Sequence, residues 1–328
     1  MRRVIASAPG VVKLFGEHAV VYGKPAIAMA INKRLYVVAV PRMDGHIKIV
    51  ARDLKTRGLM INMGENGEIG IETEYGVALN AVSYLRTAID MARMFLGEKR
   101  GVELDVSSEM PVGAGLGTSA AVAVASIRAY AEAFGYSINN EDVARLAHEV
   151  EKTVQGAASP MDTTVSALGG VHLISANGRE TIKVGSLPIV IGYVERESTT
   201  RDLVKSVGNL KNKYPIIIEL IMDAIGELTK TAKHGLEANN LEIVADLMNI
   251  NQGLLESLGV STGRLSSLIY AARRAGAIGA KLSGAGGGGI VIALAPNAVK
   301  EVAIAMEVAG GHSMIVDKDE YGARIEIE

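Results

Sequence analysis

Apolar residues in the first fifty positions recur in short alternating or continuous runs, and Gly, Pro and Asp separate the runs. This spacing is typical of β-strands joined by turns. It predicts strands at 4–7, 11–15, 26–30, 35–40 and 47–50, arranged as a meander, with Pro9 and Gly10 ending the first strand. Residues 52–72 are polar and contain several glycines, so they are expected to form a loop or edge structure.

From residue 77 the apolar positions change to helical spacing, which continues to 96, where Gly97 is a stop signal. A strand at 102–106 then leads to a glycine-rich stretch and a helix that ends near Phe134. Asn139 or Asn140 can cap the next helix, which carries an apolar stripe to Val154. A further helix is expected to start at Ser159 and Pro160, since these are a good N-cap and a good first helical residue.

The second half of the chain alternates strands and helices. Strands are predicted at 171–175 and 189–194, then helices at 201–210, 215–234, 240–257 and 264–275. The remaining elements are strands at 278–282 and 290–294, a helix at 299–308, and strand-like pieces at 313–316 and 324–327. Pro188 marks the expected junction between two domains. The pattern therefore predicts a chain of mixed strands and helices with two domains, 1–184 and 185–328.

Composition narrows the possible partners. The chain has 328 residues, 48% hydrophobic and 21% charged, and a formal net charge of -2. A surface without excess positive charge argues against nucleic acid or an anionic membrane as partner. There is no cysteine, which excludes disulfides and thiolate metal sites, so that any metal should be held by oxygen. Without a signal-like segment at its start, the protein is expected in the cytoplasm.

The glycine-rich stretch is the strongest candidate for a phosphate-binding loop. Three glycines at alternate positions allow a close approach of the backbone to a ligand, and the helix that follows presents unpaired amides to an anion. The stretch lacks the lysine of a Walker A loop, and no strand leads directly into it as in a dinucleotide-binding fingerprint. A flexible helix entry is the alternative. The residues are Pro111, Val112, Gly113, Ala114, Gly115, Leu116, Gly117, Thr118, Ser119, Ala120 and Ala121.

Two carboxylates are candidates for chemistry. Glu151 lies on the margin of an apolar helix stripe, where a carboxylate is half-sheltered, although a solvated helix edge would also explain it. Asp162 falls in the first turn of a short helix. There it either completes a capping box or is held ionised by the helix dipole, aimed at a reacting hydroxyl.

Three blocks together resemble a known superfamily. They are Gly16-Glu17-His18-Ala19-Val20-Val21-Tyr22-Gly23 with the preceding Pro9-Gly10, the glycine-rich stretch, and Lys281-Leu282-Ser283-Gly284-Ala285-Gly286-Gly287-Gly288-Gly289. In this order they resemble the superfamily of galactokinase, homoserine kinase, mevalonate kinase and phosphomevalonate kinase. Together with the stretch from Val154 to Thr163, they are most similar to archaeal mevalonate kinases.

The resemblance implies a specific fold and reaction. The fold would be α+β: the N-terminal, ATP-binding domain would be of the ribosomal-protein-S5 second-domain type and the C-terminal domain ferredoxin-like, with the active site between them. ATP phosphates would bind the 111–121 loop. Ser119 and Glu151 would hold Mg²⁺, which prefers such oxygen ligands. The reaction would phosphorylate the C5 hydroxyl of (R)-mevalonate, an early step of isoprenoid synthesis, and a homodimer is expected.

The same resemblance assigns the acceptor side. Asp162 corresponds to the catalytic aspartate, which orients the hydroxyl and accepts its proton. Glu17, His18, Thr200 and Gly286 correspond to substrate-binding positions. Arg196 and Arg201 are the available cations for an acceptor carboxylate or phosphate.

One position departs from the family pattern. Members usually have Pro-Gly-Lys, with the lysine beside the catalytic aspartate, but Val11 stands here and the lysine is Lys13. On a strand these positions share a face and lie about 6.6 Å apart. Lys13 is therefore the candidate catalytic lysine, and a solvated strand lysine is the alternative. Phosphomevalonate, homoserine or a sugar as acceptor, or a non-catalytic binding protein, remain alternative functions.

Overall fold

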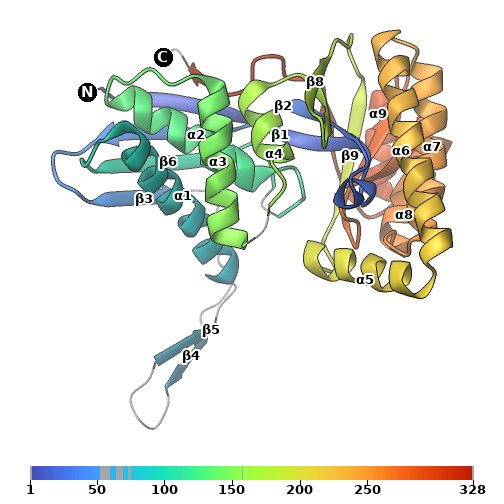
Figure 1. Cartoon of the computed structure of the whole chain (residues 1–328), viewed down its shortest axis with the longest axis horizontal. Coiled ribbons are helices and arrows are strands. Elements are labelled where there is room, and N and C mark those ends of the chain that lie inside the picture. The colour runs from blue at the N-terminus through green and yellow to red at the C-terminus, as the bar shows by residue number, and fades with distance from the viewer. Residues whose placement is uncertain are drawn as a thin grey trace.

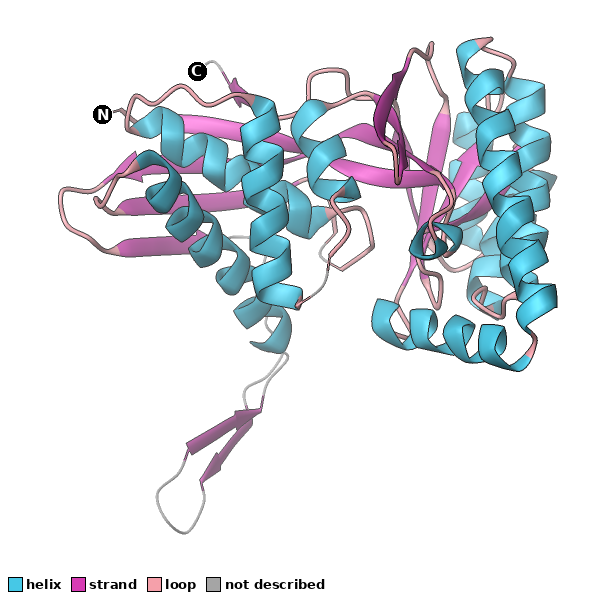
Figure 2. Ribbon diagram, in the orientation of Figure 1, coloured by secondary structure: helices cyan, strands magenta, loops and turns pink. Residues whose placement is uncertain are grey.

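The computed structural model describes residues 2–51, 60–63, 69–72, 75–111, 113–156 and 158–326. Figures 1 and 2 show two lobes side by side, each with a sheet and covering helices, and β1 and β2 extend from the first lobe toward the second. This is the α+β arrangement expected from the sequence. No helix in the described part of the chain is both long and apolar enough to cross a membrane.

The first sheet is built on two long antiparallel strands, β1 (Val4–Phe15) and β2 (Ala26–Pro41). The sequence predicted two short strands in place of each. The ladder continues because its register shifts between Pro9 and Gly10, where β2 accommodates two extra residues between Ile31 and Arg34. A bulge of this kind bends a strand without ending it, and it accommodates a proline that cannot donate a hydrogen bond.

The other strands of this sheet lie around that pair. The order is β13-β1-β2-β6-β3, and β7 pairs with the opposite end of β2 and with β8. Their bounds are β3 Ile47–Ala51, β6 Val102–Ser108, β7 Val171–Ser175, β8 Gly178–Ile182 and β13 Arg324–Glu326. In the segment expected to be loop or edge, β4 (Met60–Met63) pairs with β5 (Ile69–Glu72); the remainder of 52–72 lies outside the described residues.

The helices of the first domain match the predicted periodicity. They are α1 Tyr75–Leu96, α2 Thr118–Ala133, α3 Asn140–Gln155 and α4 Met161–Leu168. Most residues of α2 are small and buried, and this helix packs on β1 and β2. The helices α1 and α3 pack against α2 (Figure 1). The Asn139 side chain accepts a hydrogen bond from the amide of Asp142, so Asn139 is the cap of α3. A short 3₁₀ helix, η1 (Ala19–Tyr22), follows β1.

The second domain has the strand order β10-β11-β9-β12, with all neighbouring pairs antiparallel. The strands are β9 Ile189–Val194, β10 Gly279–Ser283, β11 Gly289–Leu294 and β12 His312–Val316. Helices lie between β9 and β10 and between β11 and β12, which is the βαββαβ connectivity of a ferredoxin-like fold. The helices are α5 Thr200–Lys213, α6 Pro215–Glu237, α7 Leu241–Ser257, α8 Gly263–Arg274 and α9 Val299–Val308.

The last strand returns to the first domain. β13 pairs with β1, so the end of the expected second domain, 185–328, belongs to the first sheet. The buried Arg34 side chain secures this return, because it forms an ion pair with Asp319 and donates to the carbonyl of Gly322.

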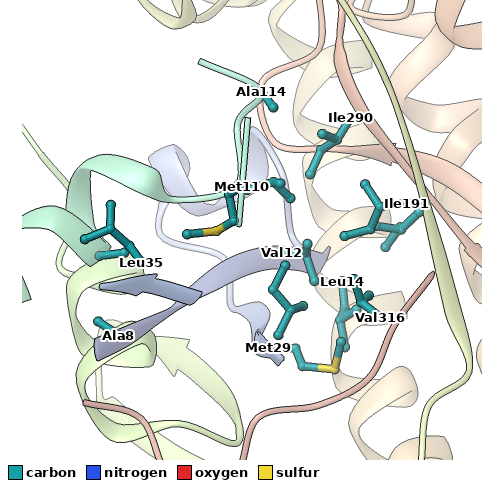
Figure 3. Close-up of a cluster of buried hydrophobic side chains, with 14 of the residues drawn as sticks. Ala8, Val12, Leu14, Met29, Leu35, Met110, Ala114, Ile191, Ile290 and Val316 are labelled. Carbon is teal, nitrogen blue, oxygen red and sulfur yellow. The ribbon is translucent and has the colours of Figure 1, made fainter. Parts of the chain in front are cut away.

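The two domains share one hydrophobic core. Figure 3 shows Val12, Leu14 and Met29 of the first sheet in the same buried cluster as Ile191, Ile290 and Val316 of the second. β1 also contacts β10 directly. The end of β1 is therefore held by both domains, which matters for the site because β1 carries Lys13.

Candidate active site

A cavity of about 610 Å³ lies between the domains. Its wall includes β1 and the loop that follows, the glycine-rich loop before α2, and the facing residues of α3 and α4. The second domain adds Arg196, Thr200, Val204, Gly284 and Ala285. Segments far apart in the chain thus meet around one space large enough for a small ligand.

The glycine-rich loop opens into this cavity. Gly117 precedes α2 in the left-handed conformation, and no side chain caps the helix, so its first amides are left for another partner. Gly115 has a φ of +95°, a conformation that favours glycine, and a Cβ there would lie 2.7 Å from Nη2 of the Arg196 side chain. Five of the eleven predicted residues line the cavity: Gly113, Gly115, Gly117, Thr118 and Ser119.

The remaining predicted loop residues occupy other positions. Ala114, Leu116, Ala120 and Ala121 are buried in the protein, where they hold the loop in place. The amide of Val11 donates to the carbonyl of Leu116 over 2.8 Å, which ties the loop to β1. Pro111 is not among the residues that line this cavity, and Val112 lies outside the described residues.

Ser119 and Glu151 meet at the wall of the cavity. The Ser119 hydroxyl donates to Oε1 of Glu151 over 3.1 Å. Glu151 is only 5% exposed, so it is more buried than a helix edge requires. Burial, with a smaller contribution from the charge of Asp162, raises the pKa of Glu151 to about 7. A cation bound beside Glu151 would stabilise its ionised carboxylate, which burial disfavours.

The oxygen pair of Ser119 and Glu151 fits Mg²⁺. Among the described residues no three His, Asp or Glu side chains gather into a ready-made metal cage. Mg²⁺ at a nucleotide site does not need one, since one or two protein ligands complete a shell of phosphate and water oxygens.

Lys13 and Asp162 form the second pair. Nζ of Lys13 lies 2.6 Å from Oδ2 of Asp162, and both residues line the cavity. Asp162 is the second residue of α4, and Ser159 accepts the first amide of this helix at 3.3 Å. The other carboxylate oxygen, Oδ1, is buried and has no hydrogen-bond partner within the described part of the chain. Asp162 therefore pairs with a lysine and retains one oxygen for a donor from a ligand.

The departure at position 11 has a structural explanation. Val11 is fully buried and packs with Met161 and Val165 of α4, so that face of β1 fills a small apolar cluster. Lys13, two residues further along, reaches the aspartate instead.

The loop after β1 holds Glu17 and His18. His18 has a positive φ of 61°, which is uncommon for a residue with a side chain, and its Nε2 lies 2.9 Å from the carbonyl of Ala285. Burial lowers the pKa of His18. Both residues border the cavity, but the Glu17 carboxylate contacts Lys281 and Asn251 of the second domain.

Of the remaining predicted residues, some line the cavity and others do not. Thr200 lines the cavity, and its hydroxyl accepts a hydrogen bond from Nη1 of Arg196 over 3.3 Å. Burial lowers the pKa of Arg196, and the structure records no ion pair for it within the described residues. Arg201 is exposed. Gly286 is not among the cavity residues; a Cβ there would lie 2.1 Å from the carbonyl oxygen of Val260.

Sequence reasoning missed several residues of the site. The cavity wall includes Tyr84 and Leu85 of α1, Val106 of β6 and Val122 of α2. Their apolar character fits the core just as well, so no local signal distinguishes them. Lys281 and Asn251 were missed as partners of Glu17, because contacts across about 250 residues leave no periodic trace in a single sequence.

Comparison with known protein families agrees with this geometry. The N-terminal domain model of the GHMP kinases matches residues 78–170, and the C-terminal model matches 232–309. A galactokinase galactose-binding signature matches residues 2–41.

Curated relatives match along the whole chain. The mevalonate kinase of Pyrococcus horikoshii is 47% identical over 99% of this chain and 98% of its own, and that of Thermococcus gammatolerans is 48% identical with the same coverage. Among solved structures, the mevalonate kinase of Methanococcus jannaschii superposes with a TM-score of 0.80 at 27% identity, covering 97% of this chain and 99% of that one. The L. major mevalonate kinase in complex with R-mevalonate has the same fold, with a TM-score of 0.80 at 24% identity, covering 98% of this chain and 96% of its own.

Proposed function

Because this chain belongs to the mevalonate kinase family of the GHMP kinases, we propose that it transfers the γ-phosphoryl group of ATP to the C5 hydroxyl of (R)-mevalonate. The products are 5-phosphomevalonate and ADP, within isoprenoid biosynthesis. The observation that carries this proposal is the meeting of the Lys13–Asp162 and Ser119–Glu151 pairs in one cavity beside a helix start without a side-chain cap.

Asp162 is the proposed base. Its Oδ1 is the unpartnered oxygen, so it can accept the hydrogen bond of the acceptor hydroxyl. The hydroxyl oxygen attacks the γ-phosphorus, the bond to the β-phosphate oxygen breaks, and the proton passes to Asp162. The ammonium of Lys13 holds the Asp162 carboxylate through the 2.6 Å ion pair and places a positive charge near the transferring group. Positioning and charge neutralisation dominate catalysis in this class of reaction.

The nucleotide side follows from the loop. Amides of 113–119 are proposed to bind phosphate oxygens, with Ser119 and Glu151 as ligands of Mg²⁺. When bound, Mg²⁺ neutralises negative charge on the phosphates. Leu85, Val106 and Val122 come from elements next to the loop, and they offer apolar surface for the adenine base.

The acceptor side needs a cation for the mevalonate carboxylate. Arg196 is our candidate, because it lines the cavity and has no carboxylate partner among the described residues. Thr200 orients its guanidinium through the 3.3 Å hydrogen bond. His18 is proposed to face the acceptor from the first domain.

The test is ADP release with Mg²⁺-ATP and each of four acceptors: mevalonate, phosphomevalonate, homoserine and galactose. Turnover with mevalonate alone supports the proposal. Preference for another acceptor would reassign the substrate. Binding of ATP without turnover of any acceptor would mean that Lys13 does not replace the family's lysine at position 11, and that the protein binds without catalysis.

We propose further that the protein acts in the cytoplasm as a homodimer, as the family resemblance implies. Sedimentation at several concentrations tests the oligomeric state, and a monomer at micromolar concentration would contradict it.

A further inference from the structure

A buried ion pair joins the two domains at the wall of the cavity. Lys281 of β10 donates to Oε1 of Glu17, which lies in the loop after β1. The side chain of Lys281 has no exposed surface and that of Glu17 is 1% exposed. Lys281 also donates to the carbonyl of Leu282 over 2.7 Å, and Glu17 is its one recorded carboxylate partner among the described residues.

A buried ion pair of this kind contributes little net stability to a contact between domains. Removing both charges from water costs several kcal/mol, and apolar residues of similar size often stabilise a protein as well or better. The shared core of Figure 3 already joins the domains. Stability alone therefore does not account for Glu17 and Lys281.

Asn251 of α7 strengthens the argument. Its Nδ2 donates to Oε2 of Glu17 over 3.1 Å, so each oxygen of the carboxylate has its own partner from the second domain. The Oδ1 of Asn251 is buried, and no described residue forms a hydrogen bond with it. A buried acceptor without a hydrogen bond lowers the stability of the folded protein. The arrangement therefore fixes the orientation of Glu17 at the expense of stability.

The fixed orientation of Glu17 helps to hold the neighbouring residue, His18, in its conformation. His18 follows Glu17 directly, its backbone has the unfavourable φ of 61°, and its ring meets the carbonyl of Ala285. Residues in such conformations persist only where their surroundings hold them. Glu17 provides that support from one side and the turn at Ala285 provides it from the other.

We propose that Lys281 is a positioning residue for phosphoryl transfer. Acting through Glu17, it holds His18 against the acceptor part of the cavity, and it also cancels a carboxylate charge beside a site for anionic ligands. The assignment to acceptor binding rests on the proposed function; the effect on His18 does not.

The test compares three variants. Lys281→Met removes the ammonium and keeps the length of the side chain. Glu17→Gln combined with Lys281→Met removes both charges, so it avoids an unpaired buried carboxylate and decides the matter if the single variant fails to fold. Ile292→Ala is the matched control: Ile292 is buried and lies opposite Lys281 in the β10–β11 ladder, but its side chain carries no charge and no hydrogen-bonding group.

We expect KM for mevalonate to rise at least about tenfold in both Lys281 variants, corresponding to about 1.4 kcal/mol. KM for ATP should stay close to that of the unchanged protein. Ile292→Ala should lower the melting temperature but should not raise KM for mevalonate relative to KM for ATP. The ring NMR signals of His18, identified by their loss in His18→Asn, should move in both Lys281 variants and keep their positions in the control.

An unchanged KM for mevalonate in the folded Lys281 variants would overturn the proposal. Equal changes in KM for both substrates, or the same changes in Ile292→Ala, would also overturn it, since they indicate a purely structural role. If the unchanged protein does not turn over mevalonate, the proposed function fails instead. The His18 signals then decide the positioning role: unmoved signals contradict it.

Discussion

At the scale of single residues, the site depends on side chains that lack a partner in the protein. Within the described residues, Oδ1 of Asp162 is buried without a hydrogen-bond partner, and Arg196 lines the cavity without an ion pair. Buried polar groups are normally satisfied, so such exceptions indicate where a ligand completes the structure. Three predictions belong at this scale.

Asp162→Asn is expected to lower kcat by about 10²–10⁴, because it removes a general base while preserving the shape of the side chain. ATP binding, measured by calorimetry, should be almost unchanged, since the nucleotide loop is separate. A variant with near-normal kcat would return Asp162 to the role of a helix-capping residue.

Lys13→Met is expected to lower kcat by about 10² or more, because it removes the cation beside Asp162. Lys48→Met is the control: Lys48 is an exposed strand lysine that pairs with Glu103 and is not among the residues that line the cavity. Steady-state rates at saturating ATP and mevalonate make the comparison. If the two variants behave alike, Lys13 is only a strand lysine.

Glu151 should make the metal-free protein less stable as the pH rises. Its folded pKa of about 7 exceeds the ordinary value of 4.5, so the folded state binds the extra proton. Stability present below about pH 4.5 is then lost as the pH rises through 7, by on the order of 3 kcal/mol. Urea unfolding in EDTA at pH 5 and pH 8 measures it, with Glu151→Gln as the reference.

The Gln variant should lack this part of the pH dependence, because its amide does not titrate. Identical curves for both proteins would show that Glu151 is ionised throughout. In activity assays Glu151→Gln should also require more Mg²⁺ for half-maximal rate, and an unchanged requirement would remove Glu151 from the proposed metal ligands.

At the scale of elements, the glycine turn between β10 and β11 shows how one motif serves packing and the site together. Gly284 faces the cavity, whereas Gly286 lies against the backbone of Val260. The family resemblance gave Gly286 a role in substrate binding, but its surroundings are those of a packing position.

Gly286→Ala is therefore expected to destabilise the protein by at least about 3 kcal/mol, because a Cβ meets the Val260 carbonyl at 2.1 Å and φ is +82°. Gly259→Ala is the matched control. It also has a positive φ, of 73°, but open space around it, so strain of about 1–2 kcal/mol is expected. Urea unfolding of both variants measures the difference, and equal losses would contradict the packing role.

At the scale of the whole molecule, the two domains are expected to unfold together. The core shown in Figure 3 runs from β1 and β2 into the second sheet, and β13 ties the end of the chain back to β1. An interface continuous with both cores couples their stabilities, in contrast to the smaller contacts of independently moving domains.

Leu14→Ala tests this coupling. Leu14 is 3% exposed in the shared cluster, and its truncation should cost about 2–5 kcal/mol. Calorimetry should show one transition shifted to lower temperature. Two separate transitions, with only one of them shifted, would show that the domains unfold independently.

The sequence by itself determined the features that depend on interactions between residues close together in the chain. Helical spacing, capping residues and glycine breaks placed α1, α2 and α3 within a few residues, and the order of strands and helices agreed with the α+β fold that the family resemblance implied. These signals act between neighbours in the chain, so one sequence contains them. The three motifs also identified the family, which the comparisons confirm.

Only the tertiary structure decided the rest. It joined the expected strand pairs through a bulge, returned β13 to the first sheet, and brought Lys13 to Asp162 across 149 positions and Lys281 to Glu17 across 264. It also separated the loop residues that face the cavity from those that pack beneath it. The physical reason is that side chains distant in sequence meet only after the sheets pair and the domains pack, so their distances and burial exist only in the folded molecule.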